Sequence, residues 1–454
     1  MTDTHDRSSL SATLFDKALR EFRRAHLDAA RALLDTVVET DPAHRDAWLL
    51  LAETHRHNNR EVAAIACLRR ANELDPTDTE TLHHLTLLCL DRGRFTEAAD
   101  YARLAVDHAP SDPTLTYLLG VALARAYRRE AAIEVFSGIL ADDPDHAAAS
   151  FEIAMIELGR GNYTSGWPFY EMRHALDAAH RSPVGPLPWT GEPAPGQRLL
   201  VTAEGGYGDT IWAARFLPAV KALGFEVTLR IPPALEALFA ALDGVDTLLV
   251  DPDNAPVDAD LWCPILSLPA RLGVTDPAAF PPARLHRQPS PDGRLDRLLE
   301  RGTGRKRVGI IWSGSITYGN NRHRAASLED FLPLIEVPSL QLFSLQKGPP
   351  QADLTDSGIG NLIVDADDFD FAETAALVEE LDLVIMTDSA VAHIAGSLNK
   401  PVWVLLDTYP YWYHGTSSAD SVWYPAMRYF RQSRPGDWAG VMVDVVAAMQ
   451  CDDR

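Results

Sequence analysis

Cysteine is scarce in this chain, whose 454 residues include only Cys67, Cys89, Cys263 and Cys451. None of them forms a CxxC pair, and none stands at metal-ligand spacing from a histidine. This argues against a disulfide framework and against a zinc site. It is typical of reduced thiols in a cytoplasmic protein.

Long apolar runs are also missing. No stretch approaches the roughly 20 apolar residues that a transmembrane helix needs. The first thirty residues are charged and lack the apolar core of a signal peptide. We therefore expect a cytoplasmic protein without a membrane span.

Basic residues are few relative to acidic ones: the chain has 41 Lys and Arg but 64 Asp and Glu, which gives a formal net charge of −23. Such a surface is soluble and repels polyanions, which argues against nucleic acid or an anionic membrane as the main partner. Acidic pairs with one residue between them could hold a divalent metal, but a chain this rich in aspartate makes such pairs by chance, so no metal is predicted. The pairs are Asp251/Asp253, Asp258/Asp260, Asp365/Asp367 and Asp368/Asp370.

What the chain does have is a proline repeat. Four prolines recur every 34 residues, at Pro42, Pro76, Pro110 and Pro144. This is the period of a helix–turn–helix repeat. Two columns share the period: Ala30, Ala64, Ala98 and Ala132, and Leu51, Leu85, Leu119 and Ile153. The pattern resembles the tetratricopeptide repeat, with about four units over residues 9–144 and a divergent unit over residues 151–176 that caps the stack.

Stacked repeats form a concave groove that suits a peptide or a partner protein. The alternatives are a dimerisation surface, which would make the protein a homo-oligomer, and a rigid spacer. We place the solenoid with its cap at residues 9–178 and a linker at residues 179–197, where five prolines forbid a continuous helix. Trp189 is expected to anchor this linker to the next domain. The prolines are Pro183, Pro186, Pro188, Pro193 and Pro195.

After the linker, short apolar runs alternate with helical patterns, which predicts parallel sheets covered by helices. We expect one α/β half at residues 198–285, a second at residues 306–432 and a closing helix at residues 437–450. Two such halves facing each other leave a cleft at the carboxyl ends of their strands, where open α/β sheets bind ligands.

One candidate site follows an apolar strand of the second half. Asp388 has the character of a helix N-cap. The backbone N–H groups of Ser389, Ala390 and Val391 would then point into the cleft and bind phosphate. His393 lies on the same helical face as Ser389 and would reach the same anion. The alternative is a structural cap and a histidine satisfied in the core, but the strand–turn–helix context favours phosphate.

A second candidate is the turn that carries Gly205, Gly206 and Gly208. Glycines in a strand-to-helix turn permit positive φ and close approach of the backbone to a ligand. Asp209 then begins the helix at the cleft edge, either as a cap or as a general base for an attacking hydroxyl. The glycine spacing differs from the dinucleotide-binding fingerprint.

Basic residues in the predicted cleft loops form a third candidate set. Lys347 ends a strand, so its ammonium is expected to project into the cleft and neutralise a leaving diphosphate without a metal. A surface salt bridge is the alternative for each member. The set is Arg322, Arg324, Lys347, Arg428 and Arg431.

These residues match a family. The second region resembles bacterial glycosyltransferases of the GT-B fold, of the heptosyltransferase-like type often fused to tetratricopeptide repeats. It is more distantly similar to the O-linked N-acetylglucosamine transferases. The matching stretches are residues 204–210, 308–314, 321–327, 344–348, 382–406 and 423–432.

The resemblance implies a helical solenoid followed by a GT-B-like domain of two Rossmann-like halves, the acceptor side first and the nucleotide-sugar side second. It implies an inverting, metal-independent glycosyltransferase with a nucleotide sugar as co-substrate and no other cofactor. Asp209 is then the catalytic base, and Lys347 contacts the diphosphate. The implied nucleotide-sugar-binding residues are Gly206, Gly208, Trp312, Gly314, Arg322, Arg324, Gln346, Lys347, Asp388, Ser389, Ala390 and His393.

The chain also departs from that family. Gly205 stands where members usually carry glutamine, and residues 411–414 replace a differently spaced aromatic and arginine stretch, so no particular sugar is predicted. The expected acceptor is a Ser or Thr hydroxyl of a protein held by the repeats, with a flagellin-like protein as one candidate. The rival hypotheses are a non-enzymatic adaptor with a degenerate GT-B domain and a sugar-nucleotide epimerase.

Overall fold

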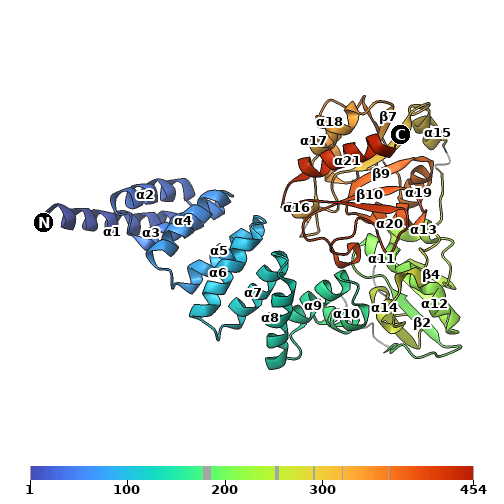
Figure 1. Cartoon of the computed structure of the whole chain (residues 1–454), viewed down its shortest axis with the longest axis horizontal. Helices are drawn as coiled ribbons and strands as arrows, with labels where there is room; N and C mark the ends of the chain where they lie inside the picture. Colours follow the sequence, from blue (N-terminus) through green and yellow to red (C-terminus); the bar gives the residue numbers. More distant parts are fainter. Residues whose placement is uncertain are drawn as a thin grey trace. The chain divides into compact units, whose positions relative to one another are not determined.

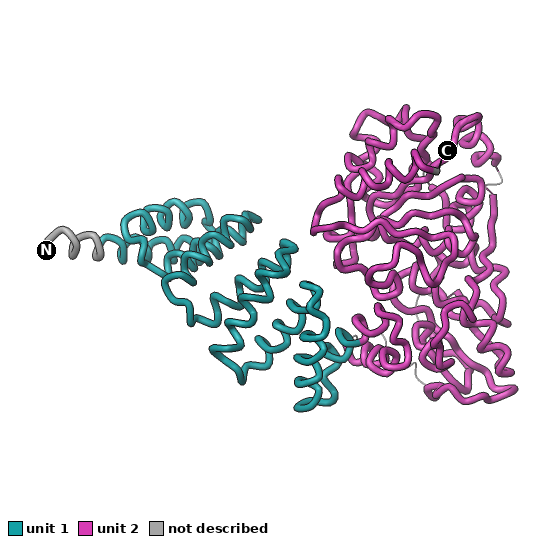
Figure 2. Tube along the Cα trace, viewed as in Figure 1, with its two compact units in different colours: residues 1–153 teal, residues 154–454 magenta. Residues whose placement is uncertain are grey.

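The computed structural model describes residues 2–176, 186–250, 255–289, 292–319, 321–366 and 368–452, with side chains from residue 10 to residue 451. The chain divides into two compact units, residues 1–153 and 154–454 (Figure 2). Three predicted features lie outside the described residues: the part of the linker that includes Pro183, the pair Asp251/Asp253, and Asp367.

The first unit is built of helical hairpins (Figure 1). The hairpins are α1 (Thr2–Arg23) with α2 (Leu27–Thr40), α3 (Arg45–His57) with α4 (Glu61–Leu74), α5 (Thr79–Asp91) with α6 (Phe95–His108), and α7 (Pro113–Arg125) with α8 (Arg129–Asp142). The boundary between the two units falls inside the next helix, α9 (Ala147–Gly159).

The repeated columns explain the hairpins. The alanine column is fully buried, which lets paired helices approach closely, and the aliphatic column fills the seam next to it. Asp41, Asp75 and Asp143 each stand directly after a helix, because the residue before a proline disfavours the helical region. A Cβ on Gly120 of α7 would lie 2.5 Å from the ring of Phe136 of α8, so this hairpin needs glycine there.

The second unit contains two parallel sheets. In the described part of the chain the first sheet has the order β1-β5-β2-β3-β4. Its edge strand comes from the linker, and Trp189 next to it is buried against Phe225, with ring centroids 5.4 Å apart. The expected anchoring role of Trp189 is therefore confirmed. The strands are β1 (Leu187–Pro188), β2 (Arg198–Thr202), β3 (Glu226–Ile231), β4 (Thr247–Val250) and β5 (Leu261–Pro264).

The second sheet has the order β11-β10-β9-β6-β7-β8 over the described residues. Counted from β6, this is the doubly wound order, and the order reverses between β6 and β9. In sheets of this kind, ligands usually bind at the carboxyl ends of the strands where the order reverses. The helix α21 (Trp438–Asp452) packs into the core of this sheet through Trp438, Val445 and Met449. The strands are β6 (Lys306–Ile311), β7 (Leu340–Ser344), β8 (Ile363–Asp365), β9 (Leu383–Thr387), β10 (Val402–Leu406) and β11 (Met427–Arg431).

The segment expected to cap the solenoid belongs to the second unit. It comprises α10 (Tyr163–Tyr170) and the 3-10 helix η1 (Glu171–Ala175). Trp167 donates a hydrogen bond from Nε1 to the Val274 carbonyl at 2.7 Å, and its ring lies 5.3 Å from that of Trp412. Large aromatic side chains replace the small residues of the repeats here, and the α/β unit supplies the apolar surface that buries them.

Among the described residues, none of the helices combines the length and the apolar composition that a membrane span requires.

Candidate functional site

Two predicted stretches, which follow strands of different sheets, meet in the second unit. The helix α11 (Tyr207–Ala213) follows β2, and α20 (Ala390–Ser397) follows β9. A Cβ on Gly208 would lie 2.9 Å from His393 Cδ2 and 3.3 Å from the Cα of Ala390. The close backbone approach predicted for this glycine is therefore made to another helix of the same unit.

Asp209 lies at this junction and caps its own helix. Its Oδ2 accepts a hydrogen bond from the Gly206 N–H at 2.8 Å, and Gly205 has a φ of 71°, as expected for the turn. Burial raises the pKa of Asp209 to about 6, against the opposing Gly206 hydrogen bond, and the charge of Asp388 adds to the rise. A carboxylate with this pKa is suited to accept a proton near neutral pH.

Asp388 is buried between two basic side chains. Its Oδ2 lies 3.2 Å from Arg324 Nη1 and its Oδ1 lies 3.1 Å from His414 Nε2. Burial alone would raise the pKa of Asp388, but His414 and Arg324 outweigh this and hold the pKa well below its usual value. Ser389 is the N-cap of α20, so the prediction that Asp388 caps this helix is wrong: its carboxylate faces the two basic groups instead.

The start of α20 keeps its backbone donors. The Ser389 side chain makes no capping hydrogen bond. The described residues supply no acceptor for the backbone N–H groups of Ala390 and Val391. Donors of this kind at a helix N-terminus, together with the helix dipole, are suited to an anion such as phosphate.

His393 does not offer a positive charge to such an anion. It is 1% exposed, and its Nδ1 lies 3.2 Å from the Tyr424 hydroxyl. Burial lowers the pKa of His393 to about 3, so the ring is neutral near pH 7. The role predicted for this residue beside a phosphate is not supported, because the ring is enclosed in the contact with Gly208.

The structure gives Lys347 an internal partner. Its ammonium donates a hydrogen bond to the Phe369 carbonyl instead of projecting freely into a cleft. The loop that follows β8 therefore holds the side chain that was expected to meet a diphosphate.

Gln346 and Trp312 are structural. The Gln346 amide accepts hydrogen bonds from the backbone N–H groups of Trp312 and Ser313, at 3.1 and 2.9 Å, and donates to the carbonyls of Ser313 and Lys347. Trp312 is fully buried in the core of the second sheet, and its Nε1 donates to Asp353 Oδ2 at 3.0 Å. Their predicted role in binding a nucleotide sugar is unsupported, because these polar groups stabilise the loop after β6.

The remaining predicted residues lie in the segment after β6 and in the edge strand β11. A Cβ on Gly314 would lie 2.8 Å from Arg324 Nη2 and 3.1 Å from the Asp388 carbonyl oxygen, so a side chain there would displace Arg324 and crowd the backbone of Asp388. Arg322 is exposed and donates a hydrogen bond to His323. The other two members of the basic set, Arg428 and Arg431, contact the Phe430 ring and the His414 carbonyl, respectively.

A pocket opens at the carboxyl ends of β9 and β10, and of its lining residues only Arg324 and Asp388 were predicted as site residues. Asp407 lies there, and burial followed by the charge of Asp388 raises its pKa to about 6. The sequence clue that could have identified Asp407 is its position directly after β10, at the same edge of the sheet as Asp388. No group of three or more His, Cys, Asp and Glu in the described ranges is arranged to hold a metal. The pocket is lined by Tyr318, Arg324, Asp388, Leu405, Leu406, Asp407, Tyr409, Pro410 and Tyr411.

The family model of the tetratricopeptide repeat matches residues 15–79, 87–143 and 117–171. The N-terminal part of this chain consists of tetratricopeptide repeats. The last match reaches residue 171, so α10 is repeat-like in sequence even though it packs within the second unit.

Among known proteins, the chain is 27% identical over 337 residues to Protein FlbA of Caulobacter vibrioides, a match that covers 67% of this chain and 55% of FlbA. Because the repeats end near residue 171, a match of that extent continues well into the α/β region. The peroxisomal targeting signal receptor of Komagataella phaffii is 38% identical over 80 residues, which cover 18% of this chain and 14% of the receptor. The chain thus spans about half the length of FlbA and a small part of the receptor.

Among solved structures, the crystal structure of MamA is similar to part of the chain. It is 18% identical in sequence, and the match covers 39% of this chain and all of MamA, with a TM-score of 0.35.

Proposed function

We propose that this protein is a metal-independent glycosyltransferase that transfers a sugar from a nucleotide sugar to a hydroxyl group. The observation that carries the proposal is the contact at Gly208, which brings Asp209 next to the start of α20. A base of suitable pKa and a set of anion-binding backbone donors then stand side by side. Two parallel sheets, of which the second has the doubly wound order, support a GT-B-like arrangement.

In the proposed reaction Asp209 accepts the proton of the acceptor hydroxyl. The hydroxyl oxygen then attacks the anomeric carbon of the sugar, and the bond to the nucleoside diphosphate breaks. The backbone N–H groups of Ala390 and Val391 stabilise the charge of the leaving diphosphate. Lys347 contributes only after its ammonium leaves the Phe369 carbonyl.

The repeats support a protein-binding role. We propose that the bound protein is itself the acceptor, which presents a Ser or Thr hydroxyl to Asp209, and that a flagellin-like protein is one such acceptor. One relative is by name a receptor for a targeting signal, which is consistent with a peptide in the groove.

A non-enzymatic adaptor is the second candidate function. The internal hydrogen bonds of Lys347 and Gln346 favour it, together with the burial of His393, because these three residues were predicted to bind the donor and are instead engaged or enclosed within the fold. The two functions differ in whether the α/β unit binds a nucleotide sugar at all.

The test uses the full chain and UDP-, GDP-, ADP-, CMP- and TDP-sugars. Thermal shift identifies the donor, because a ligand of the native state raises its melting temperature. Asp209→Asn is then expected to slow transfer by about 10²–10⁴-fold. Donor affinity should stay unchanged, because the Asn oxygen can still accept the Gly206 hydrogen bond.

Asp276→Asn is the matched control, since Asp276 also caps a short helix, through the Ala278 N–H at 3.0 Å, but lies in a different loop. It should transfer at the wild-type rate. Undiminished transfer by Asp209→Asn would remove the catalytic role of this carboxylate. If no donor shifts the melting temperature and none is consumed, the adaptor is the better description.

A further inference from the structure

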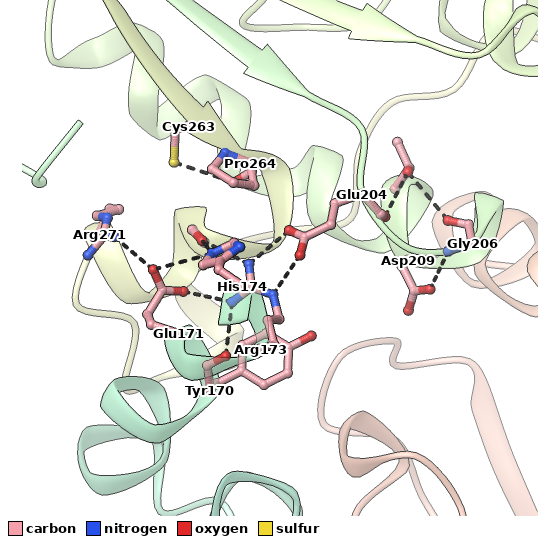
Figure 3. Close-up of polar contacts among 12 residues, drawn as sticks. Tyr170, Glu171, Arg173, His174, Glu204, Gly206, Asp209, Cys263, Pro264 and Arg271 are labelled. Atoms are coloured by element: carbon pink, nitrogen blue, oxygen red, sulfur yellow. Dashed lines mark hydrogen bonds and ion pairs between the residues drawn. The ribbon is translucent and has the colours of Figure 1, made fainter. Parts of the chain in front are cut away.

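Arg173 has the densest set of polar contacts around the candidate site (Figure 3). It is 6% exposed, and its Nε and Nη2 donate to the two carboxylate oxygens of Glu204 at 2.7 and 2.8 Å. Nη2 also donates to Ser267 Oγ at 2.8 Å, and Nη1 donates to Glu171 Oε1 and to the Tyr170 carbonyl. A two-pronged contact of this kind fixes both side chains in position.

The place of this contact in the fold is unusual. Glu204 follows β2 and Ser267 follows β5, and these two strands are neighbours at the point where the order of the first sheet reverses. Such a reversal normally leaves a ligand crevice at the carboxyl ends of the strands. Here the guanidinium of Arg173 contacts the residues that follow both strands.

Glu204 is also the first residue of the turn that carries Asp209. Its carbonyl accepts a hydrogen bond from Thr210 Oγ1 at 3.4 Å, and Gly205 next to it has a positive φ. The turn then closes through the hydrogen bond from Gly206 to Asp209. Holding Glu204 therefore holds one end of a short turn whose other end is the candidate base (Figure 3).

The same segment reaches the second sheet. The Arg173 guanidinium lies over the ring of Tyr170, 4.4 Å from its centroid, and the Tyr170 hydroxyl lies 2.9 Å from the hydroxyl of Tyr411. Tyr411 lines the pocket at the carboxyl ends of β9 and β10. Residues 170 and 173 thus contact both the turn of Asp209 and the wall of the pocket.

We propose that Arg173 is a positioning residue, which holds the turn of Asp209 against the pocket wall and makes the segment at the end of the repeats part of the working site. The expected effect on catalysis rests on the proposed function, whereas the expected effect on the position of the turn does not. Removing one partner of a buried ion pair leaves an uncompensated charge, so the turn should rearrange when Arg173 is replaced.

The test compares Arg173→Met, Arg173→Lys and Arg271→Met in the full chain by hydrogen exchange. Lysine keeps the charge but lacks the two-pronged geometry. Arg271 is the matched control: it forms an ion pair with Glu171 at 2.8 Å, in the same network, and it has no contact with Glu204 among the described residues. Both Arg173 variants should raise exchange about ten-fold or more at residues 204–211 and 408–413, with α3 to α8 unchanged. Arg271→Met should leave both segments as in the wild type.

The kinetic arm uses the donor found by thermal shift. Arg173→Lys should lower kcat by about 10²-fold, with KM for the nucleotide sugar unchanged, because a displaced base affects the reaction more than donor binding. Unchanged exchange at residues 204–211 in Arg173→Lys would overturn the proposal, as would equal effects of Arg271→Met. If the wild type consumes no donor, the proposed function fails, while exchange still decides the role of Arg173. If Arg173→Met does not fold, Arg173→Lys decides it.

Discussion

At the scale of single residues, three carboxyl groups near one another have different affinities for protons. Asp388 is held ionised by its basic neighbours, whereas the pKa values of Asp209 and Asp407 are raised to about 6 by burial and by the charge of Asp388. Environments that separate the pKa values of neighbouring groups are characteristic of functional sites.

The raised pKa of Asp209 predicts a stability effect with a defined sign. Ionisation of a group whose pKa rises from 3.8 to about 6 on folding opposes folding, so its stabilising contribution is lost as pH rises through about 6. Asp209→Asn should therefore stabilise the second unit by about 1–2 kcal/mol at pH 7.5, a value reduced for partial exposure, and by about half as much at pH 5, which lies between the two pKa values. Urea unfolding at the two pH values measures this.

Asp388→Asn is the control variant, and its free energy of unfolding should change in the opposite direction. The pKa of Asp388 is lowered on folding, so its stabilising contribution is present above its ordinary value of 3.8 and is lost only as pH falls below it. This variant should be less stable than the wild type at both pH values. A destabilised Asp209→Asn at pH 7.5 would contradict the assigned environment.

At the scale of secondary-structure elements, the site depends on how closely α11 approaches α20. The approach is this close because residue 208 has no side chain: a Cβ there would lie 2.9 Å from the His393 ring. It also encloses His393, which explains why this histidine is neutral.

Gly208→Ala is expected to destabilise the second unit by about 1–3 kcal/mol, because the added methyl group would meet the His393 ring and the backbone of Ala390. Chemical denaturation measures the loss. Gly206→Ala is the control, since its φ is −83° and its Cβ would meet only the flexible Asp209 side chain, at 3.3 Å. Equal stability of the two variants would show that the helices separate at little cost.

At the scale of the whole molecule, the chain combines a repeat array with an α/β unit, and each has its own buried core. In a repeat array each unit contacts mainly its neighbours, so stability is a sum of local terms. Perturbations should therefore act on the unit in which they are made.

Phe136→Ala should test this independence. Phe136 is fully buried in the first unit, and its truncation should cost about 3–5 kcal/mol. Calorimetry should show that only one of two transitions moves to lower temperature. Phe216 is fully buried in the second unit, so Phe216→Ala should lower the temperature of the other transition only. A bound nucleotide sugar should raise the temperature of that same transition. A single transition that responds to both variants would contradict the division.

The sequence by itself was sufficient for the repeats and for the alternation of strands and helices. A hairpin of the solenoid forms between helices that are adjacent in the chain. A repeated column of small residues therefore already predicts where the paired helices pack closely, as at Ala30, Ala64, Ala98 and Ala132. Strand β11 was missed, because Arg428 and Arg431 interrupt its apolar pattern. The edge strand β1 was also missed, because a proline-rich segment was expected to be only a linker.

Only the tertiary structure decided which polar groups face one another. Asp388 was expected to cap a helix and instead lies between Arg324 and His414, and the ammonium of Lys347 contacts the Phe369 carbonyl. The segment that carries Arg173, directly after the last repeat match, packs within the α/β unit. These pairings differ from the predicted ones because a buried charged group must form an ion pair or hydrogen bonds with whichever polar groups lie next to it in the fold. Those groups are set by how distant segments pack, whereas helix and strand periodicity is set by near neighbours.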